Sequence, residues 1–232
     1  RRPPRSTPSN SSAASDVYKR QRFRKEDLMN IPEIILASGS PRRAELLKRI
    51  GLQFRVMTGN VSEELKGVDD PRERVILLSE RKAEAVIGEV KDGLVIGADT
   101  VVVLDDEIFG KPADPDDAVR MLMRLSGKTH DVYTGFTLIQ TDGKRISDVE
   151  RTAVTFRKIE PWEIIAYVET GNPMDKAGAY GIQDQSSFFV ERIEGCFYNV
   201  VGFPIARFYR RLKDIWDDDM ISNLFFRGER GS

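Results

Sequence analysis

The stretch Ile34-Ile-Leu-Ala-Ser-Gly-Ser-Pro-Arg-Arg-Ala-Glu-Leu-Leu, residues 34–47, predicts a strand, a tight turn and a helix. Its apolar start is typical of a short buried strand. Ser40 is a suitable N-cap and Pro41 a suitable first residue for the helix, which we expect to reach Ile50. This unit indicates an α/β fold.

Arg42 and Arg43 fall in the first turn of that helix, where its dipole disfavours a cation by about 0.3–1 kcal/mol. A polyanion would reverse this effect, because backbone N–H groups, the hydroxyls of Ser38 and Ser40 and both guanidinium groups could converge on it. We therefore predict a phosphate-binding site, with pairing of the arginines to acidic neighbours as the competing interpretation. The Gly-Lys-Thr at 127–129 follows a predicted helix, so it is not a P-loop.

Strand-like and helix-like segments alternate along the rest of the chain and predict a mixed sheet flanked by helices. We expect strands at 54–58, 94–104, 132–140 and 146–159, helices at 71–90, 114–127, 161–170 and 204–216, a glycine-rich loop at 175–183 and a strand hairpin at 188–202.

The two ends of the chain are expected to lie outside this domain of residues 31–216. Residues 1–30 are rich in Ser, Pro and Arg without an apolar period, which is typical of a disordered tail. Such a composition also fits a transit peptide. However, residues 1–21 resemble a translated sequencing adapter, so we leave them out of the fold. Residues 217–232 are expected to form a polar tail.

Composition excludes several classes of protein. No segment approaches 18 uninterrupted apolar residues, so we expect no membrane span. The single cysteine, Cys196, rules out an intrachain disulfide and suits a reducing compartment, and the single histidine, His130, rules out a His-rich metal site. Residues 1–25 hold eight of the 36 basic residues and one of the 37 acidic ones, so the remaining chain is acidic. An acidic domain argues against general nucleic-acid binding and fits a small anionic substrate.

Asp99 and Thr100 are polar residues inside the apolar run Leu94–Leu104. A buried carboxylate is costly without a partner, which can be a metal, a cation or several hydrogen bonds. Lys82 falls on the apolar side of a predicted helix, where it either snorkels to solvent or serves a site. Glu63 and Lys111 lie in turns, where solvent exposure is the ordinary interpretation.

Together these basic and acidic residues near strand ends suit metal-assisted phosphoryl chemistry. Carboxylates can hold Mg²⁺ or Mn²⁺ and activate water, while Lys and Arg neutralise phosphate oxygens.

Six motifs occur in order along the chain: Ser38-Gly-Ser-Pro-Arg-Arg, Gly97-Ala-Asp-Thr-Val-Val, Gly110-Lys-Pro, Leu125-Ser-Gly-Lys-Thr-His, Asp175-Lys-Ala-Gly-Ala-Tyr-Gly-Ile-Gln and Tyr198-Asn-Val-Val-Gly-Phe-Pro. In this order and spacing the chain resembles the Maf family of nucleoside triphosphate pyrophosphatases, over residues 34 to about 215.

The resemblance implies a single elongated α/β domain, similar to inosine triphosphatases, with a mixed, strongly twisted sheet. It implies hydrolysis of dTTP and UTP to the monophosphate and pyrophosphate, a divalent cation, a cytoplasmic housecleaning role and a homodimer. The family's proposed proton acceptor matches Asp99, and its other catalytic positions match Glu63, Lys82 and Lys111. The positions tied to base choice match Arg42, Thr100 and Gln183, and the metal is expected at Asp99 and Glu63.

Two departures and two alternatives accompany this resemblance. Asp184 stands where the family usually has glycine, and Ser62 replaces a frequent aspartate. A pyrophosphatase for modified nucleotides such as 7-methyl-GTP is one alternative function. A nucleotide-binding regulator of cell division with little turnover is the other, which an intact Asp99, Lys82 and Lys111 disfavour.

Overall fold

The strand–turn–helix unit is confirmed by the computed structural model, which describes residues 31–65 and 67–226. Strand β1 (Glu33–Ala37) leads through the turn into helix α2 (Pro41–Arg49). Ser40 is its N-cap, with Oγ accepting a hydrogen bond from the Arg43 N–H at 3.4 Å. The predicted tail at residues 1–30 and the last residues of the second predicted tail, 227–232, lie outside the described part.

The further elements are β2 (Arg55–Val56), α3 (Pro71–Ile87), β3 (Gly93–Leu104), β4 (Glu107–Phe109), α4 (Pro115–Leu125), β5 (Thr129–Gln140), β6 (Arg145–Phe156), α5 (Pro161–Glu169), the 3₁₀ turns η1 (Asn172–Asp175), η2 (Ala177–Ala179) and η3 (Gln185–Phe189), β7 (Val190–Glu194), α6 (Phe197–Val201), α7 (Ile205–Lys213) and α8 (Asp218–Phe225). Most of them match a predicted segment with shifts at its ends, whereas β4, the three 3₁₀ turns, α6 and α8 were not predicted.

The strands of the described residues form one seven-stranded sheet in the order β2-β1-β3-β5-β6-β7, with β4 paired to β3. β1 runs parallel to β2 and β3, whereas β3, β5, β6 and β7 pair antiparallel. The predicted mixed sheet of an α/β fold is therefore confirmed.

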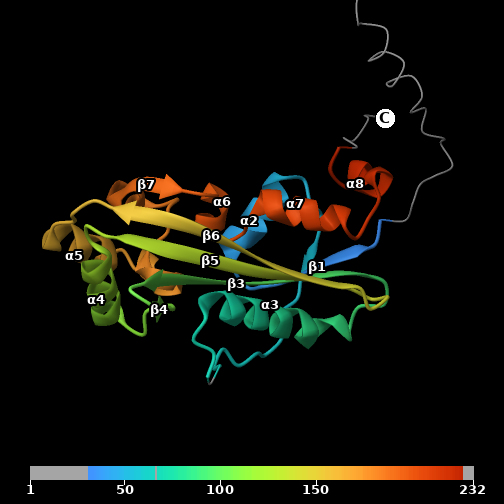
Figure 1. The fold of residues 1–232 in the computed structure, drawn as a ribbon, viewed down its shortest axis with the longest axis horizontal. Helices are drawn as coiled ribbons and strands as arrows, with labels where there is room; N and C mark the ends of the chain where they lie inside the picture. Colours follow the sequence, from blue (N-terminus) through green and yellow to red (C-terminus); the bar gives the residue numbers. More distant parts are fainter. Residues whose placement is uncertain (1–30, 66, 227–232) are drawn as a thin grey trace, which may run out of the picture. The chain divides into compact units, whose positions relative to one another are not determined.

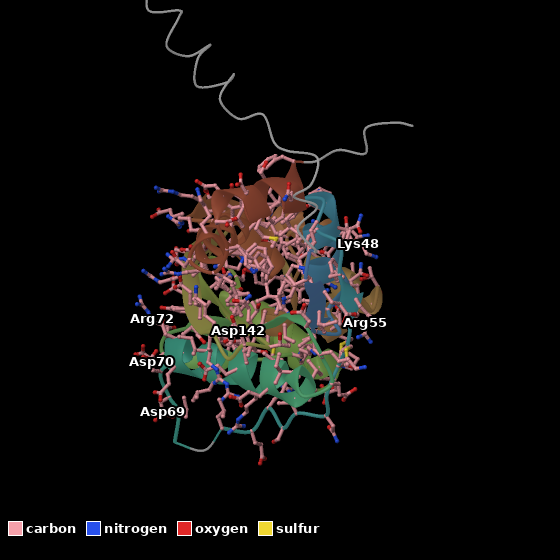
Figure 2. All side chains as sticks on the ribbon, turned by 90° about the vertical axis from the view of Figure 1, so that its right-hand side faces the viewer. Lys48, Arg55, Asp69, Asp70, Arg72 and Asp142 are labelled. Atoms are coloured by element: carbon pink, nitrogen blue, oxygen red, sulfur yellow. The ribbon has the colours of Figure 1, made fainter. Side chains whose placement is uncertain are left out.

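Helices cover both faces of the sheet, with α3 on one side and α2 and α7 on the other (Figure 1). Alternate residues of β1 enter the two cores: Ile34 and Leu36 pack with α2 and α7, and Ile35 packs with α3. This alternation follows from the two-residue period of a strand. Charged side chains such as Lys48 and Arg72 lie on the outside (Figure 2).

Two glycines let α3 lie unusually close to the centre of the sheet. A Cβ atom on Gly97 would lie 2.1 Å from the Ser79 carbonyl oxygen, and one on Gly135 would lie 2.6 Å from the Val75 carbonyl. The next turn of α3 after Ser79 carries Lys82, and Asp99 follows Gly97 on the same face of β3. The close approach therefore brings Lys82 next to Asp99.

The predicted hairpin at 188–202 is wrong in its second half. β7 ends at Glu194, and the chain then turns into helix α6. The backbone amide of Cys196 donates to Thr152 Oγ1 at 3.1 Å, and the buried Asn199 donates through Nδ2 to the Val132 carbonyl at 2.9 Å. These contacts to β5 and β6 hold the segment as a helix. They join residues far apart in the chain, so they cannot be predicted from the local sequence pattern.

The predicted polar tail after residue 216 is wrong for the residues that the structure describes there. Asp217 caps α8, accepting from the Met220 N–H at 2.8 Å. Met220 and Ile221 are buried in the same core as α2 and α7. An amphipathic helix of eight residues was hidden by the flanking aspartates.

Candidate active site

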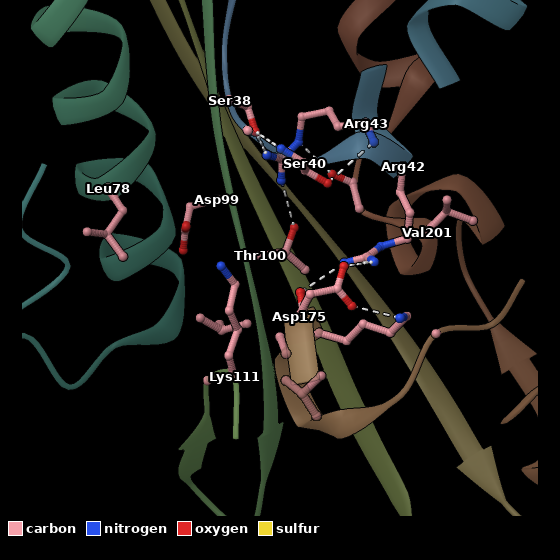
Figure 3. Close-up of a pocket in the computed structure, with 18 of the residues that line it drawn as sticks. Ser38, Ser40, Arg42, Arg43, Leu78, Asp99, Thr100, Lys111, Asp175 and Val201 are labelled. Atoms are coloured by element: carbon pink, nitrogen blue, oxygen red, sulfur yellow. Dashed lines mark hydrogen bonds and ion pairs between the residues drawn. The ribbon is translucent and has the colours of Figure 1, made fainter. Parts of the chain in front are cut away.

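One cavity of about 790 Å³ opens beside the end of β1, the start of α2, the middle of β3 and the glycine-rich loop. All ten site residues predicted from the sequence line it: Ser38, Ser40, Arg42, Arg43, Glu63, Lys82, Asp99, Thr100, Lys111 and Gln183. Figure 3 shows several of these side chains directed into the same space.

Lys82 joins the two predicted acidic groups. Its Nζ lies 2.6 Å from Asp99 Oδ1 and 3.0 Å from Glu63 Oε1. The side chains of Lys82 and Asp99 are 20% and 12% exposed, whereas that of Glu63 is 57% exposed. The snorkelling alternative for Lys82 is therefore wrong, because the ammonium group is held inside the site.

The protein shifts the pKa values of Asp99 and Glu63 in opposite directions. Burial raises the pKa of Asp99 above its ordinary value, against the opposing effects of Lys82 and Arg43. Burial also acts to raise the pKa of Glu63, but the hydrogen bond and the charge of Lys82 outweigh it and leave that pKa lowered. Two nearby carboxyls with separated pKa values are suited to different roles, with Asp99 the better proton acceptor.

Arg43 is buried in the floor of the cavity. It donates through Nη1 to Ser38 Oγ, through Nη2 to Thr100 Oγ1 at 3.3 Å and through Nε to the Gly202 carbonyl at 3.1 Å. Burial lowers the pKa of Arg43 to about 10, so the guanidinium remains charged at neutral pH. Through its bond to Thr100, the β3 residue that follows Asp99, it supplies a fixed positive charge near that carboxyl group.

Arg42 lines the same cavity as Arg43, but its guanidinium group is paired with a different residue. Its Nη1 lies 2.7 Å from Asp175 Oδ2, and its Nη2 donates to the Asp175 carbonyl at 3.1 Å. The competing interpretation, an ion pair with an acidic neighbour, is confirmed for Arg42. Arg42 thereby holds the start of the glycine-rich loop against α2.

Lys111 and Gln183 approach the cavity from opposite loops. Both are exposed. Lys111 follows β4, and its side chain is directed toward Asp99 (Figure 3). Among the described residues, neither side chain makes a hydrogen bond, so both are available to a ligand.

Three residues of the site were missed from the sequence. Asp175 holds Arg42, as described above. Arg74 donates to the Glu63 carbonyl at 3.3 Å, and Arg81 donates to the carbonyls of Ser62 and Glu64 at 3.2 and 3.1 Å. The two arginines fasten the turn that carries Glu63 to α3.

Of these three residues, only Arg74 could have been assigned to the site from the local sequence. It precedes Lys82 by eight residues, which is about two helical turns and puts both near one side of α3. Arg81 and Asp175 could not be assigned partners without the tertiary structure.

Asp99 and Glu63 together fit a divalent cation whose remaining ligands include oxygens of the bound substrate. Within residues 31–65 and 67–226, no three His, Cys, Asp or Glu side chains gather as a complete metal site. Asp99 and Glu63 both contact the ammonium group of Lys82, and their carboxylate oxygens are hard donors. Mg²⁺ is commonly bound by one or two carboxylates together with substrate phosphates, which agrees with this donor set.

Comparison with known proteins gives a consistent family. The family model described as Maf-like protein matches residues 33–215. The dTTP/UTP pyrophosphatase of Pelotomaculum thermopropionicum is 50% identical over 182 residues, covering 78% of this chain and 95% of that protein. The dTTP/UTP pyrophosphatase of Carboxydothermus hydrogenoformans is 48% identical over 183 residues, covering 78% and 98%.

The solved structure of the Staphylococcus aureus Ham1 protein aligns with 79% of this chain and 100% of the Ham1 chain, at a TM-score of 0.48 and 15% identity.

In the described part of the chain, no helix has the length and apolarity needed to cross a membrane.

Proposed function

The chain belongs to the Maf-like protein family, and from this premise we propose that it hydrolyses dTTP and UTP to the nucleoside monophosphate and pyrophosphate. It is a nucleoside triphosphate pyrophosphatase. Its relatives at about 50% identity carry the name dTTP/UTP pyrophosphatase. The structural observation that carries the proposal is the bridge from Lys82 to both Asp99 and Glu63 within the cavity.

In the proposed reaction, Asp99 accepts a proton from the water that attacks the α-phosphorus. Its raised pKa favours proton acceptance, and Lys82 holds its carboxylate in place. Arg43 and Lys111 offset negative charge on the phosphate oxygens as the bond to the pyrophosphate group breaks.

We further propose that Asp99 and Glu63 hold Mg²⁺ or Mn²⁺. A bound divalent cation would polarise the phosphoryl group and neutralise charge on the leaving pyrophosphate. The carboxylate oxygens of this pair support the proposal. A homodimer and a cytoplasmic location are proposals that rest on the family resemblance, and the single Cys196 suits the latter.

Product analysis tests the bond that is cleaved. Incubation of the protein with dTTP and Mg²⁺ in ¹⁸O-labelled water, followed by ion chromatography and mass spectrometry, should give labelled dTMP and unlabelled pyrophosphate. Formation of dTDP and orthophosphate would refute the assignment. EDTA should abolish turnover and added Mg²⁺ or Mn²⁺ should restore it, whereas full activity in EDTA would refute the metal proposal.

A further inference from the structure

Asp184 directly follows Gln183, yet its carboxylate faces away from the cavity. It is absent from the cavity lining, and its side chain is 21% exposed. Oδ1 accepts from the hydroxyl of Tyr167 at 3.1 Å and from the Ser186 N–H at 2.9 Å. Asp184 therefore does not line the cavity, although it is covalently joined to Gln183, which does.

The bonds around Asp184 close a tight turn with Gln183 at its exposed side. The Asp184 N–H donates to the Gly181 carbonyl at 3.1 Å. Ser186 Oγ accepts from the Gly181 N–H at 3.0 Å and lies 2.8 Å from both the Gly181 carbonyl oxygen and Asp184 Oδ1, to one of which it donates at a time. Gly181, Asp184 and Ser186 are thus bonded to one another, and Gln183 projects from them.

The turn is anchored to the protein core through Tyr167. This residue of α5 is 4% exposed, and its ring packs edge-on against Phe189 at 5.5 Å. Burial raises the pKa of Tyr167, so its hydroxyl stays protonated and serves as a donor to Asp184. The anchor is rigid because it belongs to a packed core.

A second connection runs from Asp184 to the helix that carries Arg42. Lys176 Nζ lies 3.6 Å from Asp184 Oδ2 and 2.7 Å from Asp175 Oδ1, and Asp175 pairs with Arg42 at 2.7 Å. The side chain of Lys176 is 11% exposed. The loop is therefore fastened on one side to α5 and on the other to α2.

We propose that Asp184 is a positioning residue for base selection: its hydrogen bonds to Tyr167 and Ser186 hold the carboxamide of Gln183 where it can pair with uracil or thymine. This inference rests on the proposed function. A fixed carboxamide presents one donor and one acceptor to the imide edge of these bases, whereas cytosine presents the reverse pattern. A loosened loop would still admit nucleotides but would lose this discrimination.

The test compares kcat/KM for UTP and CTP in the wild type, Asp184→Ala and Asp184→Asn. Leaving a polar group unpaired costs about 1–3 kcal/mol, so the UTP-to-CTP ratio should fall at least about fivefold in Asp184→Ala. The change should appear mainly in KM for UTP. Asp184→Asn keeps an acceptor oxygen for Tyr167 and Ser186 and loses only the longer ion pair with Lys176, so its ratio should stay closer to that of the wild type than to that of Asp184→Ala.

Two further variants separate positioning from general stability. Asp217→Ala removes a similar aspartate cap, on α8, which packs against α7, and should leave the ratio unchanged. In a Gln183→Ala background, Asp184→Ala should lower the ratio no further, because both changes act through one side chain. Additive losses would overturn the proposal, as would an unchanged ratio in Asp184→Ala or an equal loss in Asp184→Asn.

If Asp184→Ala does not fold, Tyr167→Phe tests the positioning role instead. This variant removes only the hydroxyl donor and keeps the packed ring. It should lower the ratio in the same direction, and an unchanged ratio would then refute the inference. If the wild type cleaves neither UTP nor dTTP, the proposed function fails by itself. Equilibrium binding of UMP and CMP then tests the positioning role, with selective binding expected in the wild type and lost in Tyr167→Phe.

Discussion

Replacing Lys82 by methionine should destabilise the protein because it leaves Asp99 without its closest cation. Methionine keeps most of the stem but removes the ammonium group, which lies 2.6 Å from Asp99 Oδ1. Removing one member of a buried ion pair typically costs 3–5 kcal/mol. Here Arg43 still acts on Asp99, and both side chains retain some exposure, so we expect a loss of about 2 kcal/mol.

The contact of Lys82 with Glu63 should add little to this loss. Glu63 is 57% exposed, and ion pairs with exposed groups contribute about 0–1 kcal/mol. The double variant Lys82→Met/Asp99→Asn should therefore regain most of the lost stability, since no buried charge remains to be paired.

Urea unfolding of the wild type, both single variants and the double variant measures this coupling. Equal stability of Lys82→Met and the wild type would refute the reasoning, as would a double variant whose loss is the sum of the single losses.

The pH dependence of Lys82→Met provides a second check. Because the folded protein raises the pKa of Asp99, the resulting stability is fully present below the ordinary value of 3.8 and is lost as pH rises through the folded pKa. Without Lys82 this loss is larger. The stability gap between Lys82→Met and the wild type should thus widen as pH rises above 3.8.

Three other predictions follow from single residues. Asp99→Asn should lower kcat by at least about 10²-fold with an unchanged near-UV spectrum, and near-full activity would assign the proton to another acceptor. Gly135→Ala should cost about 3 kcal/mol or more in urea unfolding, because its Cβ would lie 2.6 Å from the Val75 backbone, whereas Gly88→Ala, which meets no atom within 4 Å, should be neutral or slightly stabilising. Burial lowers the pKa of His130 from 6.5 to about 4, so on the order of 3 kcal/mol of stability present above pH 6.5 should be lost as pH falls toward 4. His130→Gln should flatten that part of the pH profile, and an unchanged slope would assign it to other groups.

Local sequence was enough to predict the elements whose causes are local. The turn from β1 to α2 follows from an apolar run, a Ser40 cap and Pro41, all within a few residues of one another. The long central strand carrying Asp99 was visible as an apolar run, and the position of a carboxylate inside it marked the site. The family motifs then indicated the other site residues, all of which line one cavity.

Local pattern failed where contacts between distant segments override it. Residues 197–201 form a helix because Asn199 and Cys196 bond to neighbouring strands, although the segment resembled a strand. Asp217 starts a helix whose apolar residues complete a core built mainly from other elements. Propensity is a weak guide in such segments because burial against the rest of the protein decides their conformation.

The sequence by itself determined the α/β class, the strand–turn–helix unit and the set of residues that meet at the cavity, because local propensity and family motifs report these. Only the tertiary structure decided which partner each residue of that set has. Arg43 enters the floor of the cavity, while Arg42 turns to Asp175, 133 residues away in the chain. Asp184 turns from the cavity to Tyr167. Adjacent residues take different roles because a side chain's partner depends on which distant segments the fold brings beside it, and the spacing of residues along the chain carries no record of that.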